Sequence, residues 1–244
     1  MVVLPSVIGL VWAVFAGEFR LAHVALVTTW MMGYFAFYAT SLWLKSRRKP
    51  RFFKSTVTYL TLAGVLALGM LVLEPQWWTW GLVFGPLTAI AFWMVMSRRE
   101  RSVVSNLVTV LAAALIPLVM GSRSVFELDG LPELAVVSAV CFGYFFGTMF
   151  YVKTIIRERG HLSWVVASVV WHLLWTVIAI FLPVPHNWLL VVFFAAITIR
   201  AFLVAMLGPM RGRNIRARTI GIWEVVTSLF LAAAFVVVLM GATT

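Results

Sequence analysis

The sequence reads LAHVALVTTWMMGYFAFYATSLWL at residues 21–44 and then KSRRKPRFFK at residues 45–54. The first segment contains no Lys, Arg, Asp or Glu and exceeds the roughly 20 apolar residues that a helix needs to cross a bilayer. The second segment is strongly basic, and Lys and Arg concentrate in cytoplasmic loops of membrane proteins. Together they predict a membrane helix whose C-terminal end faces the cytoplasm.

The same pattern of apolar runs and polar breaks continues along the whole chain. Of 244 residues, 63% are hydrophobic and 11% charged, whereas soluble domains have about half apolar and a quarter charged residues. The apolar runs predict nine spans, at residues 2–16, 21–44, 55–73, 80–96, 103–120, 134–156, 162–184, 188–207 and 220–240. No long polar segment separates them. We therefore predict an all-α, polytopic transmembrane helical bundle that forms a single integral-membrane domain over residues 1–244.

The basic residues predict the orientation of this bundle. Clusters follow the second, fourth, sixth and eighth spans, and the remaining loops hold only Arg20 and Arg123. The positive-inside rule then places the N-terminus inside and the C-terminus outside. Orientation and an anionic inner leaflet account for the net charge of +11, so we expect the lipid bilayer and no nucleic acid as partner. The outer side receives Glu18, Glu74, Glu127, Asp129 and Glu133, and Trp77, Trp78, Trp80 and Trp188 as an interfacial aromatic belt.

The first span is unusually short. Its 15 residues (2–16) would extend about 22 Å, against a hydrocarbon core of about 30 Å. One interpretation is a short span; the other is a signal peptide cleaved after Val14-Phe15-Ala16, which would leave eight spans. Signal peptides normally carry Lys or Arg before the apolar region, and none is present here, which favours the span.

An internal repeat is a second open question. Gly33-Tyr34-Phe35 and Gly143-Tyr144-Phe145 lie 110 residues apart, and each triplet is followed by a basic helix end. This offset predicts half-repeats 1–110 and 111–216 in the same orientation, plus a ninth span at 219–241. The alternative is coincidence, because glycine and aromatic residues are common in membrane helices.

Two opposite charges fall inside the last two spans. Arg200 lies about 10 Å from the cytoplasmic end of the eighth span, and Glu224 about 9 Å into the antiparallel ninth. An unpaired charge at that depth costs at least a few kcal/mol, so we predict an intramembrane ion pair. It is either a clamp between helices or part of a ligand or proton site.

His172 lies near the middle of the seventh span, with Ser168 and Thr176 four residues either side on the same helix face. These residues, with Asn106 of the fifth span, are candidates to line a polar cavity. The alternative is that the stripe supplies hydrogen bonds between helices.

The basic ends of the second and sixth spans are candidate anion-binding sites. Two converging clusters of Lys and Arg could hold a lipid phosphate, although the positive-inside rule alone also explains them. The candidate residues are Lys45, Arg47, Arg48, Lys153, Arg157 and Arg159.

Motifs of known chemistry are absent from the sequence. It has no Asp-rich pair for Mg²⁺, no H-E-x-x-H, no G-x-S-x-G and no glycine-rich phosphate loop. It contains one cysteine, which excludes an intrachain disulfide. We therefore assign no catalytic residue and expect no metal site and no cofactor.

Several motifs resemble one family. They are SLWLKSRR at 41–48, RRERS at 98–102, YFFGT at 144–148 with YVKT at 151–154, IRERG at 156–160, and Ile220-Gly221 with Glu224. This set is similar to the YwiC-like family of bacterial multi-pass membrane proteins, over essentially the whole chain. The resemblance implies a bacterial cytoplasmic membrane and a topology, but no activity. Such proteins usually begin with a Gln-His-Gly-Ala-Trp-Ala-Met stretch, so we expect that the start site used here is late or the sequence truncated, and that a His-bearing segment before Met1 is missing.

The plan of four plus four plus one spans is also similar to UbiA-type intramembrane prenyltransferases. Those enzymes carry Asp-rich Mg²⁺ motifs where this chain has Arg and Lys, so the similarity does not imply shared metal chemistry. Three functions remain open: binding or transfer of an isoprenoid or lipid phosphate; an accessory or assembly factor that binds other subunits of a membrane complex, such as a respiratory one; and a transporter in which His172, Arg200 and Glu224 line one pathway.

Overall fold

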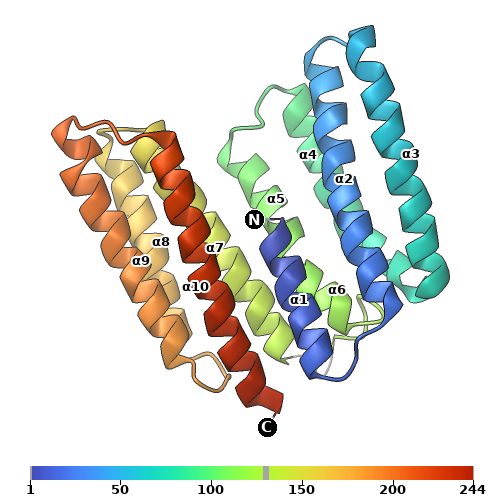
Figure 1. The fold of residues 1–244 in the computed structure, drawn as a ribbon. Coiled ribbons are helices and arrows are strands. Elements are labelled where there is room, and N and C mark those ends of the chain that lie inside the picture. Colours follow the sequence, from blue (N-terminus) through green and yellow to red (C-terminus); the bar gives the residue numbers. More distant parts are fainter. Residues whose placement is uncertain (1, 129–131, 244) are drawn as a thin grey trace. The chain divides into compact units, whose positions relative to one another are not determined.

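The computed structural model describes residues 2–128 and 132–243, so Asp129 of the predicted outer loops lies outside the described residues. Over these residues the secondary structure is entirely helical (Figure 1). Eight helical stretches are long and apolar enough to cross a membrane, and one shorter apolar helix precedes them. The prediction of a multi-pass, all-α membrane protein is confirmed.

The helices closely follow the predicted spans. In chain order they are α1 (Val3–Phe15), α2 (Leu21–Lys45), α3 (Pro50–Leu73), the 3₁₀ helix η1 (Pro75–Trp80), α4 (Gly81–Met96), α5 (Val103–Ala114), α6 (Ile116–Gly121), α7 (Pro132–Ile156), α8 (Leu162–Ile180), α9 (Trp188–Leu207), the 3₁₀ helix η2 (Pro209–Arg211) and α10 (Ala217–Thr243). The predicted fifth span is divided into α5 and α6 next to Pro117, which lacks the N–H that a continuous helix requires.

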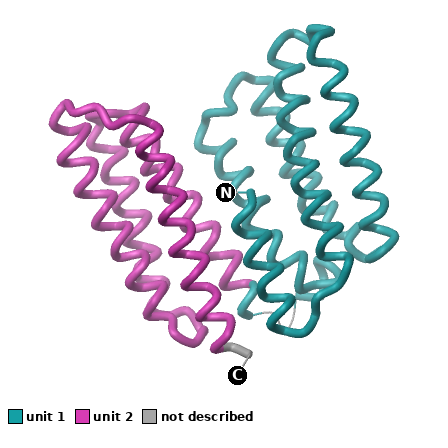
Figure 2. The backbone as a smooth tube through the Cα atoms, viewed as in Figure 1, with its two compact units in different colours: residues 1–134 teal, residues 135–244 magenta. Residues whose placement is uncertain are grey.

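The chain divides into two compact units, residues 1–134 (unit 1) and 135–244 (unit 2), as Figure 2 shows. Unit 1 contains α1 to α6, and unit 2 contains almost all of α7 together with α8 to α10. The predicted half-repeats stay a prediction.

The end of unit 1 away from its basic loops is held by His23 near the start of α2. The Arg20 backbone N–H donates to His23 Nδ1 at 3.1 Å, so the other ring nitrogen carries the proton and donates to the Met120 carbonyl at 3.0 Å. His23 is fully buried; its contact with Arg20 caps α2, and its contact with Met120 ties α2 to the end of α6. An ion pair between Arg20 and Glu74, 2.6 Å apart, joins the start of α2 to the end of α3.

The predicted aromatic belt is partly wrong. Trp78 and Trp188 are 61% and 58% exposed, as residues of a belt should be, but Trp77 and Trp80 are buried. The indole N–H of Trp77 donates to the Ser122 carbonyl at 2.8 Å, and that of Trp80 donates to Ser122 Oγ at 3.2 Å. The physical reason is the 3₁₀ turn η1, which turns these two rings into unit 1 and leaves Trp78 outside.

Two glycines set the packing of unit 2. Gly143 and Gly147 lie one turn apart on α7, and α8 packs directly against their backbone. A Cβ at Gly143 would lie 2.2 Å from the ring of Trp175, and one at Gly147 would lie 2.7 Å from His172 Nε2. The Trp171 indole N–H also donates to the Gly143 carbonyl at 2.8 Å. This spacing of small residues is typical of close helix contacts in membranes.

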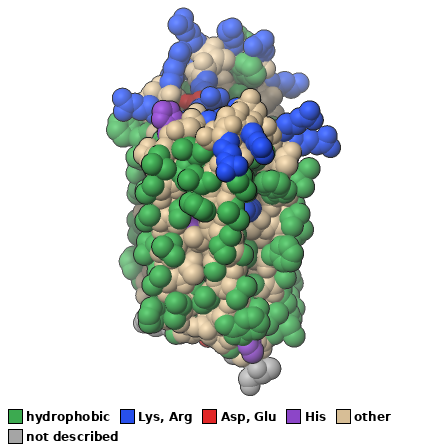
Figure 3. All heavy atoms as spheres, turned by 90° about the vertical axis from the view of Figure 1, so that its left-hand side faces the viewer, with side chains coloured by type: hydrophobic (Ala, Val, Ile, Leu, Met, Phe, Trp, Pro, Cys, Tyr) green, Lys and Arg blue, Asp and Glu red, His purple; other side chains and the backbone are tan. Residues whose placement is uncertain are grey.

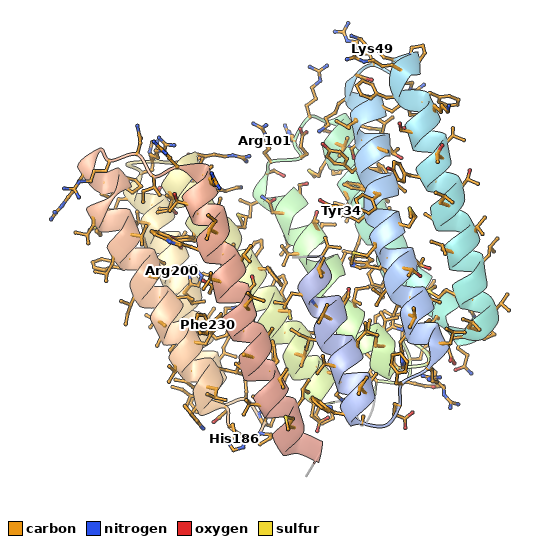
Figure 4. The ribbon with its side chains drawn as sticks, in the orientation of Figure 1. Tyr34, Lys49, Arg101, His186, Arg200 and Phe230 are labelled. Atoms are coloured by element: carbon orange, nitrogen blue, oxygen red, sulfur yellow. The ribbon has the colours of Figure 1, made fainter. Side chains whose placement is uncertain are left out.

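Charge and apolar surface are segregated on each unit. The face of unit 2 seen in Figure 3 carries Lys and Arg at one end, and apolar side chains cover most of the remainder. Within unit 1, Lys49 after α2 and Arg101 after α4 lie at one end of that unit (Figure 4). These are the ends that the sequence assigns to the cytoplasm.

Candidate functional site

Unit 1 contains a partly open cavity of about 580 Å³. Its walls come from α2, α3, η1, α4, α5 and α6, and from Val2 before α1. The volume lies within the range of about 300–1,000 Å³ that is typical of small-molecule sites. None of its lining residues is charged, and the few hydroxyls include that of Tyr34 on α2 (Figure 4). Such a cavity suits an apolar ligand.

Tryptophans line the part of this cavity next to η1. Trp30, Trp77 and Trp80 all line it, and the indole N–H of each is already bonded, to Val2 O, Ser122 O and Ser122 Oγ. Because the polar atoms are satisfied elsewhere, the rings present carbon to the cavity. The contact with the protein is therefore apolar in this part as well.

A second, smaller pocket of about 210 Å³ lies at the basic end of unit 1. Three cationic side chains line it, Lys45 and Arg48 at the end of α2 and Arg98 at the end of α4. Its apolar wall includes Val95, one turn beyond the cavity-lining Phe92 on α4. Three residues of helix correspond to about 4.5 Å, so the cationic pocket begins one turn from the apolar cavity.

Matching helix ends build this cationic pocket. Both α2 and α4 end in Ser-Arg-Arg, at residues 46–48 and 97–99. The C-cap serine is followed by an arginine in the left-handed region, with φ of 59° at Arg47 and 54° at Arg98. The next residue returns its N–H to a carbonyl one turn back, Arg48 to Trp43 at 2.9 Å and Arg99 to Met94 at 2.8 Å. This is the Schellman arrangement, in which glycine is the usual left-handed residue.

Lys45 has a carboxylate partner. Its Nζ lies 3.4 Å from Glu100 Oε1, and both side chains are about one-third exposed. The pKa of the Glu100 carboxyl is lowered from its ordinary value, first by a hydrogen bond from its own backbone N–H and then, against a contribution from burial, by the charge of Lys45. Glu100 is therefore ionised at neutral pH and neutralises one of the three cations.

Unit 2 contains a separate polar network around Glu224 of α10. Arg200 Nη2 of α9 lies 2.8 Å from Glu224 Oε1, between the two helices in Figure 4. The other carboxylate oxygen accepts from Thr148 Oγ1 of α7 at 3.0 Å and from the Tyr144 hydroxyl at 3.3 Å. Tyr144 Oη is also 3.0 Å from Ser228 Oγ. Glu224 Oε2 is thus hydrogen-bonded, whereas the buried Oε1 has its ion-pair contact with Arg200 and no hydrogen bond within the described residues.

The Arg200 guanidinium is equally constrained. Its Nη1 donates to Thr227 Oγ1 at 2.8 Å, and its central carbon lies 4.4 Å from the centre of the Tyr151 ring. The arginine is 18% exposed and its glutamate partner 15%. A charge pair with these contacts can fix α7, α9 and α10 to one another within unit 2.

His172 packs between the helices of unit 2. Its Nδ1 lies 2.7 Å from the Ser168 carbonyl, which makes Nδ1 the protonated nitrogen and leaves Nε2 facing Gly147. Thr176 Oγ1 donates to the His172 carbonyl at 2.9 Å and lies 3.3 Å from Thr198 Oγ1 of α9. The stripe of His172, Ser168 and Thr176 therefore lies within helix contacts. Asn106 belongs to unit 1, where its Nδ2 donates to the Ser102 carbonyl at 2.9 Å.

Comparison with known proteins now gives the family. Residues 1–121, which lie in unit 1, match the model described as YwiC-like protein. The chain belongs to the YwiC-like family. It is 27% identical to the uncharacterized protein YwiC of Bacillus subtilis over 236 residues, which cover 96% of this chain and 91% of that protein. It is also 27% identical to an uncharacterized protein of Haemophilus influenzae over 153 residues, 63% of each chain. No solved structure matches.

The six candidate anion-binding residues of this YwiC-like chain divide between the units. Lys45, Arg47 and Arg48 lie at the end of α2 in unit 1, where Arg47 is exposed and Arg48 lies over the Trp43 ring at 5.8 Å. The two clusters belong to different units, so an anion site that both clusters share stays a prediction.

The unit 2 cluster is largely occupied by contacts of its own. Lys153 is 7% exposed and lies 5.3 Å from the centre of the Trp164 ring. Arg159 donates from Nε to the Ile155 carbonyl at 3.1 Å and from Nη1 to Asn214 Oδ1. Arg157 is exposed. In unit 1, Lys45 and Arg48 line a pocket, so that cluster is the better placed of the two to receive a ligand.

Sequence reasoning missed several site residues of the YwiC-like chain. Tyr144, Thr148 and Tyr151 stand at positions i, i+4 and i+7 of α7, and this helical spacing of polar groups would have placed them on one face. Arg98 was missed because the positive-inside rule alone explained the basic cluster after the fourth span. The repeated Ser-Arg-Arg was the available signal for it.

Proposed function

We propose that this protein binds the apolar chain of an isoprenoid or other single-chain lipid inside unit 1. The observation that carries the proposal is the cavity of about 580 Å³ whose lining contains no charged residue. Apolar surface left without a partner is unfavourable, and a cavity of this size lacks the dispersion contacts that close packing provides. A lipid chain would restore both kinds of contact.

The distribution of charge supports a location and an orientation in the membrane. We infer a bacterial cytoplasmic membrane, with the basic helix ends on the cytoplasmic side by the positive-inside rule. In that orientation the tryptophan end of the cavity is near the outer leaflet, and its opposite end approaches the cytoplasmic basic pocket. The proposal is one of binding; no transfer step is assigned to any residue.

The unit 2 network serves, in this proposal, to hold the helices of that unit together. Glu224 and Arg200 form an ion pair, and hydroxyls from α7 and α10 contact both side chains. An ion pair with contacts to three helices supports a structural clamp.

The experiment fills the cavity without disturbing the fold. Gly33 on α2 lines the cavity, and a Cβ added there would meet no atom within 4 Å. Gly33→Leu should therefore fold, place a side chain in the cavity and exclude the ligand. The probe is a farnesol analogue with a diazirine, photolysed with the purified full-length protein in phosphatidylcholine nanodiscs. We expect labelled peptides from α2 and α4 in the wild type and loss of most labelling in Gly33→Leu.

Gly64→Leu is the matched control. Gly64 is also a helical glycine with no atom within 4 Å of an added Cβ, but it lies on α3 outside the lining of the cavity. Labelling should persist in this variant. Equal labelling of wild type, Gly33→Leu and Gly64→Leu, or labels spread evenly over lipid-facing surfaces, would exclude the cavity as the binding site.

A further inference from the structure

The pocket at the basic end of unit 1 has the composition of an anion site. Lys45, Arg48 and Arg98 line about 210 Å³ together with three apolar side chains. We propose that these three residues bind a phosphate group and that Glu100 occupies Lys45 while the site is empty. The proposal rests on the proposed function, because it names the head group of the lipid whose chain the neighbouring cavity holds.

The geometry places cations from two helix ends around one space. Lys45 and Arg48 come from the end of α2, and Arg98 comes from the end of α4. Arginine presents several N–H donors in a fixed plane that suits phosphate oxygens, and lysine adds a point charge. Three cations against the single carboxylate of Glu100 leave the pocket positive, which favours an anionic over a neutral head group.

Glu100 gives the pocket a reversible latch. Its carboxylate is 3.4 Å from Lys45 Nζ, and both groups are partly solvent-exposed, so water screens their attraction and the pair is weak. A phosphate can displace such a partner at little cost. Arg98 has no hydrogen-bond or ion-pair partner for its side chain in the described part of the chain, so it is available to the ligand at once.

The proximity of the two spaces identifies the ligand class. On α4 the cavity reaches Ala91 and Phe92, and the cationic pocket begins at Val95 and Met96. A separation of one helical turn, about 5 Å, is short enough for a single molecule to occupy both. The ligand is therefore a single apolar chain that ends in a phosphate or diphosphate.

The test compares three probes on the full-length protein in phosphatidylcholine nanodiscs: farnesyl phosphate, farnesol and inorganic phosphate. Binding is measured by competition with the diazirine farnesol, and for inorganic phosphate by calorimetry. Arg98→Gln should weaken farnesyl phosphate at least about tenfold, the effect of losing one charged hydrogen bond, and leave farnesol unchanged. Glu100→Gln should tighten farnesyl phosphate by about two- to fivefold, since it releases Lys45.

Matched neighbours provide the controls. Arg47 and Arg99 belong to the same two Ser-Arg-Arg ends but do not line the pocket, so Arg47→Gln and Arg99→Gln should change binding less than twofold. Inorganic phosphate that binds in an Arg98-dependent way supports the site and identifies a free anion as a further ligand. Equal effects of Arg98→Gln and Arg99→Gln, or equal affinity for farnesol and farnesyl phosphate, would overturn the head-group site while the chain cavity stands. Failure of farnesol itself to bind the wild type would instead overturn the proposed function.

Discussion

Breaking the ion pair between Arg200 and Glu224 should destabilise the protein far more when one partner is removed than when both are. The pair joins α9 to α10 at 2.8 Å within predicted membrane spans, and its side chains are 18% and 15% exposed. Removing either partner leaves a charge without its counter-ion in a medium that solvates it poorly. A loss of about 3–5 kcal/mol is typical when a buried pair is broken in this way.

Two single variants and their combination test this reasoning. Glu224→Leu leaves the Arg200 charge and removes the acceptor of Thr148 Oγ1, and Arg200→Met leaves the carboxylate. The double variant carries neither charge, and replacing a buried pair with apolar residues of similar size is often nearly neutral. We expect each single change to cost about 3–5 kcal/mol and the double change less than either, so that the coupling energy is at least about 2 kcal/mol.

The assay is reversible unfolding in mixed micelles with increasing dodecyl sulfate, followed by circular dichroism. The pair of Lys45 and Glu100 serves as the comparison, because it is wider, 3.4 Å, and about one-third exposed. Its coupling energy should stay below about 1 kcal/mol. Additive losses for Arg200→Met and Glu224→Leu, or a coupling no larger than that of the surface pair, would refute the clamp.

Three further outcomes are expected. Gly143→Ala should lower the free energy of unfolding by about 1–3 kcal/mol, because its Cβ would lie 2.2 Å from the Trp175 ring. Gly33→Ala has open space around its Cβ and should raise the free energy of unfolding by up to about 1 kcal/mol. The dodecyl sulfate titration measures both changes. Trp77→Phe removes the donor to the Ser122 carbonyl and should cost about 1 kcal/mol or more, and Trp78→Phe should change little, as thermal unfolding would show. The contribution of the Glu100 carboxylate should be complete above the ordinary carboxyl pKa and decline as pH falls through its lowered pKa, so the difference in stability between wild type and Glu100→Gln should shrink only in acid.

The sequence was sufficient to predict the helices because the bilayer imposes a simple rule on them. A segment that crosses a membrane must satisfy its own backbone and be apolar over about 20 residues, which is visible one segment at a time. The pairing of Arg200 with Glu224 was predictable for a similar reason: depth along neighbouring antiparallel helices follows from residue counting, and unpaired charge is costly there.

Features that depend on packing between distant segments could not be predicted from single segments of the sequence. The cavity is formed where six elements of unit 1 fail to fill the space between them, and no single stretch of sequence reports this. Arg98 joins Lys45 only because the ends of α2 and α4 are neighbours. Trp77, Trp78 and Trp80 are residues of one type in one short segment, so the sequence does not distinguish them. Only the 3₁₀ turn decides which of the three rings are buried.

Native mass spectrometry of the intact protein released from nanodiscs tests the central claim most directly. After incubation with farnesyl phosphate, wild type and Gly64→Leu should each carry one added mass of that lipid, and Gly33→Leu should appear without it. The same adduct on Gly33→Leu as on the other two, or its absence from all three, would contradict the binding of a lipid chain in the cavity of unit 1.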